Sequence, residues 1–223
     1  MLENKIYQQD NIGNLIINDN CLNILYNIPD NSIEYCLTSP PYNRKRNDKY
    51  KNFRDINNDW YQLNVDVIKQ LLRITKNHIF YNIQANFYNK KDVYKLIGTF
   101  HENIIDIHIW QKSNPIPSSG KNITNAVEYF IILGKSPLKS NFNYTKNIIT
   151  TSVNSKMPKE HKAVMKPEVA EHFIINFTKE NDTILDPFFG MGTTGIISKK
   201  YNRKFIGIEL DNDYFIKSCN ICL

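Results

Sequence analysis

Residues 186–195 read Asp-Pro-Phe-Phe-Gly-Met-Gly-Thr-Thr-Gly, and they give the strongest indication of the fold class. It follows a short apolar run and precedes a helical pattern at 194–200. Gly190, Gly192 and Gly195 have the G-x-G-x-x-G spacing, which lets a chain turn tightly from a strand into a helix. The first N–H groups of such a helix face a ligand. The stretch therefore predicts a nucleotide-type binding loop in an α/β protein.

A carboxylate stands at the spacing from this loop that a ribose-binding acid needs. Glu209 ends the next apolar run, at 205–208, and its two oxygens can accept hydrogen bonds from both hydroxyls of a ribose. The loop lies close to the end of the sequence, so the second half of a dinucleotide fold does not follow it. A cofactor with one nucleoside, such as S-adenosylmethionine, is therefore favoured over NAD.

Apolar runs and helical patterns alternate along the rest of the chain, which is typical of an α/β protein with a largely parallel sheet. Strands are expected at 15–17, 33–38, 78–83, 104–110, 127–133, 183–185 and 205–208. Helices are expected at 21–26, 60–74, 91–100, 168–177, 194–200 and from about 212. Residues 135–162 show little periodicity and are expected to form a long loop or a small subdomain.

Composition indicates a single domain, residues 1–223, in an intracellular, cytoplasmic protein. The chain has 223 residues, a net charge of +6 and 41% hydrophobic residues, which suits one core and favours a polyanionic partner. No segment resembles a secretion signal or reaches the roughly 18 apolar residues of a membrane span. Of the four cysteines, only Cys219 and Cys222 form a Cys-x-x-Cys pattern, and no second pair is present to complete a zinc site. Reduced thiols and no metal site are therefore predicted.

A second loop, residues 38–43, reads Thr-Ser-Pro-Pro-Tyr-Asn and follows the expected strand at 33–38. An amino group on a base ring is a poor nucleophile because its lone pair is delocalised. Two fixed oxygens that accept its hydrogens favour a pyramidal nitrogen, and the Ser39 hydroxyl and the Pro40 carbonyl are candidates. Pro41 and Pro40 fix φ and lack N–H groups, and Tyr42 offers a ring for base stacking. This loop predicts methyl transfer to an exocyclic amino nitrogen.

Together the two loops resemble those of the amino-directed DNA methyltransferases, which modify cytosine N4 or adenine N6. Ser39-Pro40-Pro41-Tyr42 matches the catalytic tetrapeptide of that family, and its position before the glycine loop matches the permuted group called beta. The resemblance implies a Rossmann-like, S-adenosylmethionine-dependent fold with a seven-stranded, mostly parallel sheet flanked by helices. The cofactor-binding residues that it implies are Asp19, Lys166, Pro167, Asp186, Pro187, Phe188, Gly190, Gly192, Thr193, Thr194 and Glu209.

Some segments match the family less well. Met191 replaces the usual serine, and His161 is not carried over as a ligand because the proline after it is missing and its spacing to Lys166 is one residue too long. The segment from Trp110 and Lys112 to Glu128 resembles the hairpin region of the family.

The expected partner is double-stranded DNA, contacted by loops near 43–58, 111–125 and 135–162. Six basic residues follow the tetrapeptide and are the predicted phosphate contacts: Arg44, Lys45, Arg46, Lys49, Lys51 and Arg54. A homodimer and a companion restriction endonuclease are further expected partners, because many relatives dimerise and the family serves restriction-modification systems.

The target base and two other readings stay open. No cysteine follows a proline, which excludes methylation of cytosine C5 through a thiolate. In the family, serine at the first tetrapeptide position slightly favours cytosine N4 over adenine N6. The alternatives are the same fold acting on RNA adenine or a protein amide, and a DNA- or nucleotide-binding protein without turnover.

Overall fold

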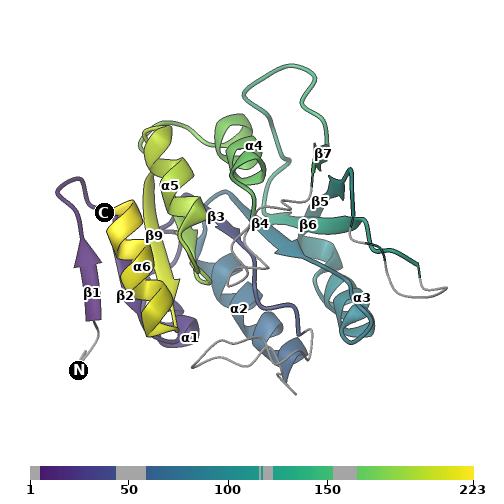
Figure 1. Ribbon diagram of the computed structural model, residues 1–223, viewed down its shortest axis with the longest axis horizontal. Coiled ribbons are helices and arrows are strands. Elements are labelled where there is room, and N and C mark those ends of the chain that lie inside the picture. Colours follow the sequence, from purple (N-terminus) through teal and green to yellow (C-terminus); the bar gives the residue numbers. More distant parts are fainter. Residues whose placement is uncertain (1–5, 44–58, 116, 118–122, 153–164) are drawn as a thin grey trace.

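Helices cover both faces of one mixed sheet in the computed structural model, which describes residues 6–43, 59–115, 117, 123–152 and 165–223 (Figure 1). Its strands are β1 (Ile6–Gln9), β2 (Leu15–Asn18), β3 (Tyr35–Thr38), β4 (His78–Ile83), β5 (Ile104–Lys112), β6 (Val127–Gly134), β7 (Ile148–Thr151), β8 (Thr183–Asp186) and β9 (Lys204–Glu209). Its helices are α1 (Cys21–Leu25), α2 (Trp60–Ile74), α3 (Lys90–Thr99), the short 3-10 helix η1 (His101–Asn103), α4 (Pro167–Phe177), α5 (Thr193–Lys200) and α6 (Asn212–Cys222).

The strand order brings the ends of distant segments to one edge of the sheet. The order is β1-β2-β9-β8-β3-β4-β6-β5-β7, and the five strands from β2 to β4 in this order are parallel neighbours. Their carboxyl ends therefore meet at one edge, where open α/β sheets bind ligands. β6 runs antiparallel to both β4 and β5, so residues near its start also lie at this edge.

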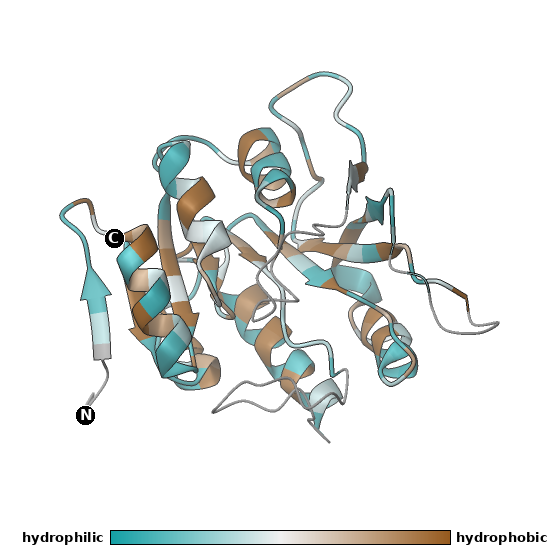
Figure 2. Cartoon of the chain, viewed as in Figure 1, coloured by the Kyte–Doolittle hydropathy of each residue, from teal (hydrophilic) through white to brown (hydrophobic). Residues whose placement is uncertain are grey.

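Alternating side chains on the central strands explain the two helical layers. All six residues of β4 are buried. Ile79 and Tyr81 belong to the core beneath α1, α2 and α3, whereas Phe80 points to the other face and stacks against Phe173 of α4, with ring centroids 4.9 Å apart. Successive side chains of a strand point to opposite faces, so a strand between two layers is apolar throughout. Figure 2 shows hydrophobic residues concentrated along the central strands and on the inner sides of helices.

Two strands escape the sequence analysis, so the described sheet has nine strands where seven were expected. β1 lies in a polar segment and pairs antiparallel with β2 at the sheet edge, where backbone hydrogen bonds suffice to hold it. β7 lies within the expected loop at 135–162, at the opposite edge, and pairs parallel with β5. The expected loop at 43–58 lies outside the described residues beyond Asn43.

The described part of the chain contains no helix that is long and apolar enough to cross a bilayer. All four cysteines are buried free thiols. Burial raises the pKa of Cys222 to about 11, so this thiol stays protonated near neutral pH. Cys219 and Cys222 belong to the core between α6 and the sheet, which accounts for their spacing.

Candidate active site

The sheet joins the two sequence loops through one direct hydrogen bond. β3 and β8 are adjacent parallel strands, so the loops that follow them start side by side. Thr38, the last residue of β3, donates from Oγ1 to Asp186 Oδ1 over 2.7 Å, although 148 residues separate the two. The tetrapeptide begins one residue after Thr38. Its position is therefore tied to the first residue of the glycine loop.

Asp186 anchors the glycine loop from within the core. Its side chain is 5% exposed, and its other oxygen, Oδ2, accepts a hydrogen bond from Thr194 Oγ1 over 2.8 Å. The Phe188 N–H donates to Oδ1 over 3.1 Å, which closes the turn after β8. Burial raises the pKa of Asp186 to about 6, although the three hydrogen bonds act in the opposite direction. This carboxylate organises the loop, because its oxygens face the protein.

The glycines of the loop meet two different physical needs. Gly192, the residue before α5, has φ of +81°, and an added Cβ would lie 2.5 Å from the Cys222 sulfur. Only glycine satisfies that backbone and that space. At Gly195, an added Cβ would lie 2.6 Å from the Phe189 ring, so this glycine lets α5 pack closely on the ring.

Glu209 ends β9 beside the glycine loop and forms its acidic side. The Gly190 N–H donates to Oε2 over 2.7 Å, and the Asp211 N–H donates to Oε1 over 2.8 Å. Each oxygen keeps a further lone pair, so the carboxylate can still accept from two neighbouring hydroxyls. Burial raises the pKa of Glu209 to about 7, against the effect of its two N–H donors. The residues present therefore fit the ribose of an adenosine-containing group.

The other predicted cofactor residues lie on neighbouring segments. Asp19 follows β2, the neighbour of β9, and its N–H donates to the Glu209 carbonyl over 3.2 Å. Its Oδ1 accepts from Asn23 Nδ2 over 2.9 Å. Lys166 is buried at the start of α4, and its Nζ lies 3.5 Å from Ser152 Oγ, whereas Pro167 is exposed. Asp19 thus lies at the edge of the predicted cofactor site, and Lys166 beside the end of β7.

The backbone of the tetrapeptide is held by donors from α2 and from the segment after β4. Trp60 Nε1 donates to the Pro41 carbonyl over 2.6 Å. The Tyr42 carbonyl accepts from Asn86 Nδ2 over 2.7 Å and from Asn89 Nδ2 over 2.8 Å. Among the described residues, no donor reaches the carbonyl of Pro40. The one backbone oxygen that the chemistry requires is therefore available, while the next two are occupied.

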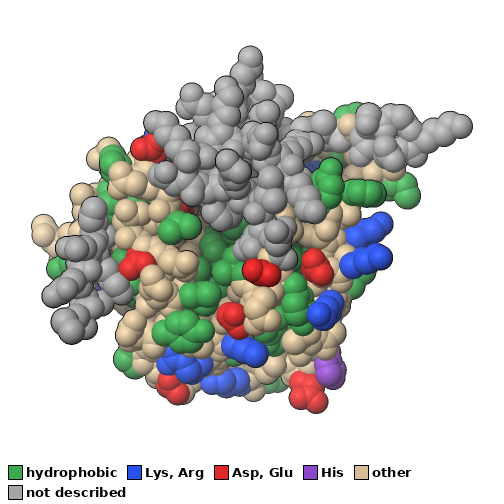
Figure 3. All heavy atoms as spheres, turned by 90° about the horizontal axis from the view of Figure 1, so that it is seen from below, with side chains coloured by type: hydrophobic (Ala, Val, Ile, Leu, Met, Phe, Trp, Pro, Cys, Tyr) green, Lys and Arg blue, Asp and Glu red, His purple; other side chains and the backbone are tan. Residues whose placement is uncertain are grey.

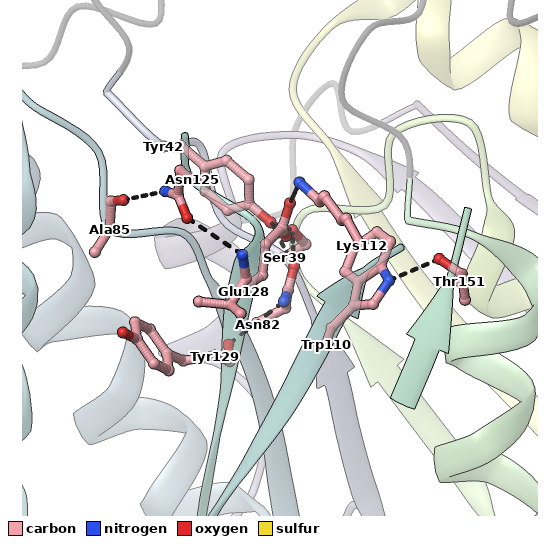
Figure 4. Close-up of polar contacts among 11 residues, drawn as sticks. Ser39, Tyr42, Asn82, Ala85, Trp110, Lys112, Asn125, Glu128, Tyr129 and Thr151 are labelled. Atoms are coloured by element: carbon pink, nitrogen blue, oxygen red, sulfur yellow. Dashed lines mark hydrogen bonds and ion pairs between the residues drawn. The ribbon is translucent and has the colours of Figure 1, made fainter. Parts of the chain in front are cut away.

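The side chains of Ser39 and Tyr42 enter a buried polar cluster (Figure 4). Ser39 Oγ lies 2.8 Å from Tyr42 Oη and 3.0 Å from Asn82 Oδ1. Tyr42 Oη also contacts Asn82 Oδ1, and it donates to Glu128 Oε2 over 2.8 Å. Lys112 Nζ lies 2.5 Å from Glu128 Oε1 and completes the cluster with an ion pair. The Ser39 hydroxyl therefore has acceptors inside the protein for its own hydrogen.

Burial of Tyr42 bears on the predicted stacking of a base. Its side chain is 7% exposed, and its hydroxyl points inward to the polar cluster. A base that stacks on the ring must first gain access to it, so stacking stays a prediction.

The predicted DNA contacts Arg44, Lys45, Arg46, Lys49, Lys51 and Arg54 lie outside the described residues. Figure 3 shows the molecule from below, the side toward which β9 runs in Figure 1. On the visible coloured part of this face, basic side chains are interspersed with acidic ones. The side chains visible there form no uniformly positive surface, and the phosphate contacts stay a prediction.

The fold and the paired loops define a methyltransferase of the Rossmann-like class. A family model described as a DNA methylase, of the N6/N4 type, matches residues 33–218, and the chain belongs to this family. It is 28% identical over 240 residues to the type II methyltransferase M.HinfI of Haemophilus influenzae; that alignment covers 90% of this chain and 66% of the relative. The chain therefore spans about two thirds of the length of M.HinfI.

Solved structures confirm the expected fold class. The PvuII DNA methyltransferase, described as cytosine-N4-specific, superimposes with a TM-score of 0.77 at 18% identity, over 93% of this chain and 86% of that one. The complex of M1.HpyAVI with SAM superimposes with a TM-score of 0.64 at 22% identity, over 92% and 98% of the two chains. At these identities, the likeness establishes the fold.

Sequence reasoning did not identify several residues that shape the site. Asn82 lies near the carboxyl end of β4, next to β3, so the rule that parallel strand ends meet could have found it. Glu128 and Lys112 contact each other from two antiparallel strands; the resemblance to a hairpin region placed them on neighbouring strands, but only the observed register brings their side chains together. Trp60 reads as an apolar residue of an amphipathic helix, and only the fold gives its indole N–H a role.

Proposed function

We propose that this protein transfers the methyl group of S-adenosylmethionine to an exocyclic amino nitrogen of a base in double-stranded DNA. The observation that carries the proposal is the pair of oxygens at the tetrapeptide. Ser39 Oγ has internal acceptors for its own hydrogen, and the Pro40 carbonyl has no donor among the described residues. Both oxygens can therefore accept hydrogens from one amino group, which frees the nitrogen lone pair for the methyl carbon.

The glycine loop and the end of β9 would hold the donor. When bound, S-adenosylmethionine supplies an electrophilic methyl group on a sulfonium. Glu209 would accept from the ribose hydroxyls, and Asp186 would keep the loop in shape through Thr194 and Thr38. Asp19, Lys166, Pro167, Pro187, Phe188 and Thr193 are proposed as further contacts. M1.HpyAVI, a structural neighbour, is itself described in complex with SAM, which supports the choice of donor.

For the target we favour cytosine N4 over adenine N6. Ser39 stands at the tetrapeptide position where serine favours cytosine in the family, and the PvuII enzyme is described as cytosine-N4-specific. Mass spectrometry of nucleosides from methylated DNA tests the choice, because N4-methylcytosine and N6-methyladenine are separate products. N6-methyladenine as the product would overturn it.

The test of the site compares Ser39→Ala with Ser32→Ala, a serine in a turn away from the site. Purified protein is expected to transfer labelled methyl from S-adenosylmethionine to DNA. Ser39→Ala is expected to lose at least about 100-fold of that rate while it still binds the donor, and Ser32→Ala to keep it. Label found only in RNA or in protein would point to the other acceptors, and unimpaired transfer by Ser39→Ala would remove the assignment.

A homodimer and a companion restriction endonuclease stay predictions. Sedimentation of the purified protein with and without DNA tests the first. Protection of methylated DNA from an endonuclease encoded next to this protein tests the second.

A further inference from the structure

A chain of hydroxyl groups leads from the proposed acceptor site to a buried carboxylate (Figure 4). Ser39 Oγ lies 2.8 Å from Tyr42 Oη, which lies 2.8 Å from Glu128 Oε2. Glu128 is 3% exposed and Tyr42 is 7% exposed. The atoms are within hydrogen-bonding distance at each step, and the far end of the chain is shielded from solvent.

The cluster has a preferred direction of hydrogen bonding. The Tyr42 hydroxyl has one hydrogen, and three of its polar neighbours are Ser39, Asn82 and Glu128. A carboxylate in an ion pair with Lys112 is the strongest acceptor of the three, so the Tyr42 hydrogen points to Glu128. Ser39 then donates to Tyr42 or Asn82, and its remaining lone pairs stay available to the substrate.

We propose that Glu128 receives the proton that the target amino group loses, passed on by the hydroxyls of Ser39 and Tyr42; this rests on the proposed function. The amino nitrogen bonds to the methyl carbon as the carbon–sulfur bond breaks, and the electron pair of that bond stays on sulfur, which becomes a neutral thioether. In the same step, as positive charge develops on the nitrogen, one of its protons moves to Ser39 Oγ. The Ser39 proton moves to Tyr42 Oη, and the Tyr42 proton moves to Glu128 Oε2.

The other members of the cluster have separate roles in this relay. Asn82 orients Ser39, and its amide oxygen accepts a hydrogen bond without taking up a proton. Lys112 lies 2.5 Å from Glu128 Oε1, and this contact holds the carboxylate in position to accept from Tyr42. Both are positioning residues.

The experiment measures single-turnover methyl transfer to DNA in H₂O and in D₂O for wild type, Glu128→Gln and Tyr42→Phe. Glutamine keeps the size of Glu128 and an acceptor oxygen for one of its two donors, Tyr42 and Lys112, but it cannot take up a proton. We expect each variant to lose about 100-fold in the transfer rate constant, with donor affinity by calorimetry unchanged. The solvent isotope effect of the wild type is expected to disappear, and the double variant to lose no more than either single one. Glu102→Gln, which removes an exposed carboxylate, is the matched control.

The possible results separate a failure of the proton relay from a failure of the proposed function. Wild-type transfer rates in Glu128→Gln would overturn the relay and leave the proposed function intact. A slower variant that keeps the isotope effect, with a lower unfolding temperature, would make Glu128 a structural residue and also overturn the relay. A wild-type protein that transfers no methyl group to DNA would refute the proposed function, and the relay with it.

Discussion

Glu209 makes the binding of S-adenosylmethionine depend on pH in a direction that the structure fixes. Burial raises the pKa of its carboxyl to about 7 in the protein without S-adenosylmethionine. Ribose hydroxyls donate to the ionised carboxylate and stabilise it, so binding lowers this pKa and releases a proton. Affinity must therefore rise with pH as Glu209 ionises, and level off once it is ionised.

The size of the effect follows from the fraction of Glu209 that is ionised. With a pKa of about 7, this fraction falls about tenfold between about pH 8 and about pH 6, which corresponds to about 1.4 kcal/mol of binding free energy. Isothermal titration calorimetry of the wild type at both pH values measures the change in the dissociation constant. Titrations in two buffers of different ionisation enthalpy measure the proton release directly.

The control is Glu209→Gln, which keeps an acceptor oxygen but cannot ionise. It is expected to bind weakly and to lose most of the pH dependence, with a remainder near pH 6 from Asp186, whose pKa burial raises to about 6. Subtracting the pH dependence of this variant from that of the wild type also removes the contribution of the titrating groups of S-adenosylmethionine itself. Glu180→Gln, at an exposed carboxylate, should behave as the wild type. If the wild-type dissociation constant changes less than about twofold between the two pH values, Glu209 does not control the pH dependence of binding. An equal pH dependence in Glu209→Gln would lead to the same conclusion.

Three further changes test the structure around the site. Gly192→Ala is expected to lower the free energy of unfolding by about 2–4 kcal/mol, because the alanine combines a strained φ with a steric clash. Gly98→Ala, which has open space at its Cβ, should raise the free energy of unfolding by about 0.5–1 kcal/mol. Urea denaturation measures both values, and equal effects of the two substitutions would contradict the clash at Gly192. Thr194→Val is expected to cost about 1–3 kcal/mol in the same assay because the buried Asp186 loses a donor, and unchanged stability would show that this hydrogen bond is dispensable. Trp60→Phe removes the hydrogen bond from the indole N–H to the Pro41 carbonyl. We expect methyl transfer to slow about tenfold while the affinity for S-adenosylmethionine is unchanged. A variant that transfers methyl groups as fast as the wild type would show that this hydrogen bond does not position the tetrapeptide.

Local sequence patterns predicted most elements, and one helix and one strand among them match at both ends. The helix at 60–74 and the strand at 78–83 have the bounds of α2 and β4 because apolar periodicity and side-chain burial coincide there. Other boundaries differ by one or two residues, such as β9, which starts at Lys204 and ends at Glu209. Backbone pairing with neighbouring strands extends these elements beyond their apolar residues.

The two missed strands have the opposite character. β1 and β7 lie at the two edges of the sheet, and only the first half of each strand is hydrophobic. Edge strands bury little apolar area, so periodicity does not reveal them. Pairing with β2 and β5, respectively, stabilises them, and pairing is a property of the assembled sheet.

The chemistry of the two loops can be predicted from the residues of each loop alone. The spacing in Ser39-Pro40-Pro41-Tyr42 and in residues 186–195 reflects local backbone needs, such as fixed φ at proline and positive φ at Gly192, which act within a few residues. Requirements of this local kind can be recognised from the sequence of the loop itself.

How these loops act together depends on the arrangement of the strands in the folded protein. The contact between Thr38 and Asp186, and the cluster that joins Tyr42 to Asn82 and Glu128, depend on which strands are neighbours. Strand order is set by burial over the whole sheet, so the partners of a loop side chain are not encoded near it in the sequence. For this reason the sequence predicts the acceptor oxygens of the site, whereas the route for the departing proton appears only in the folded protein.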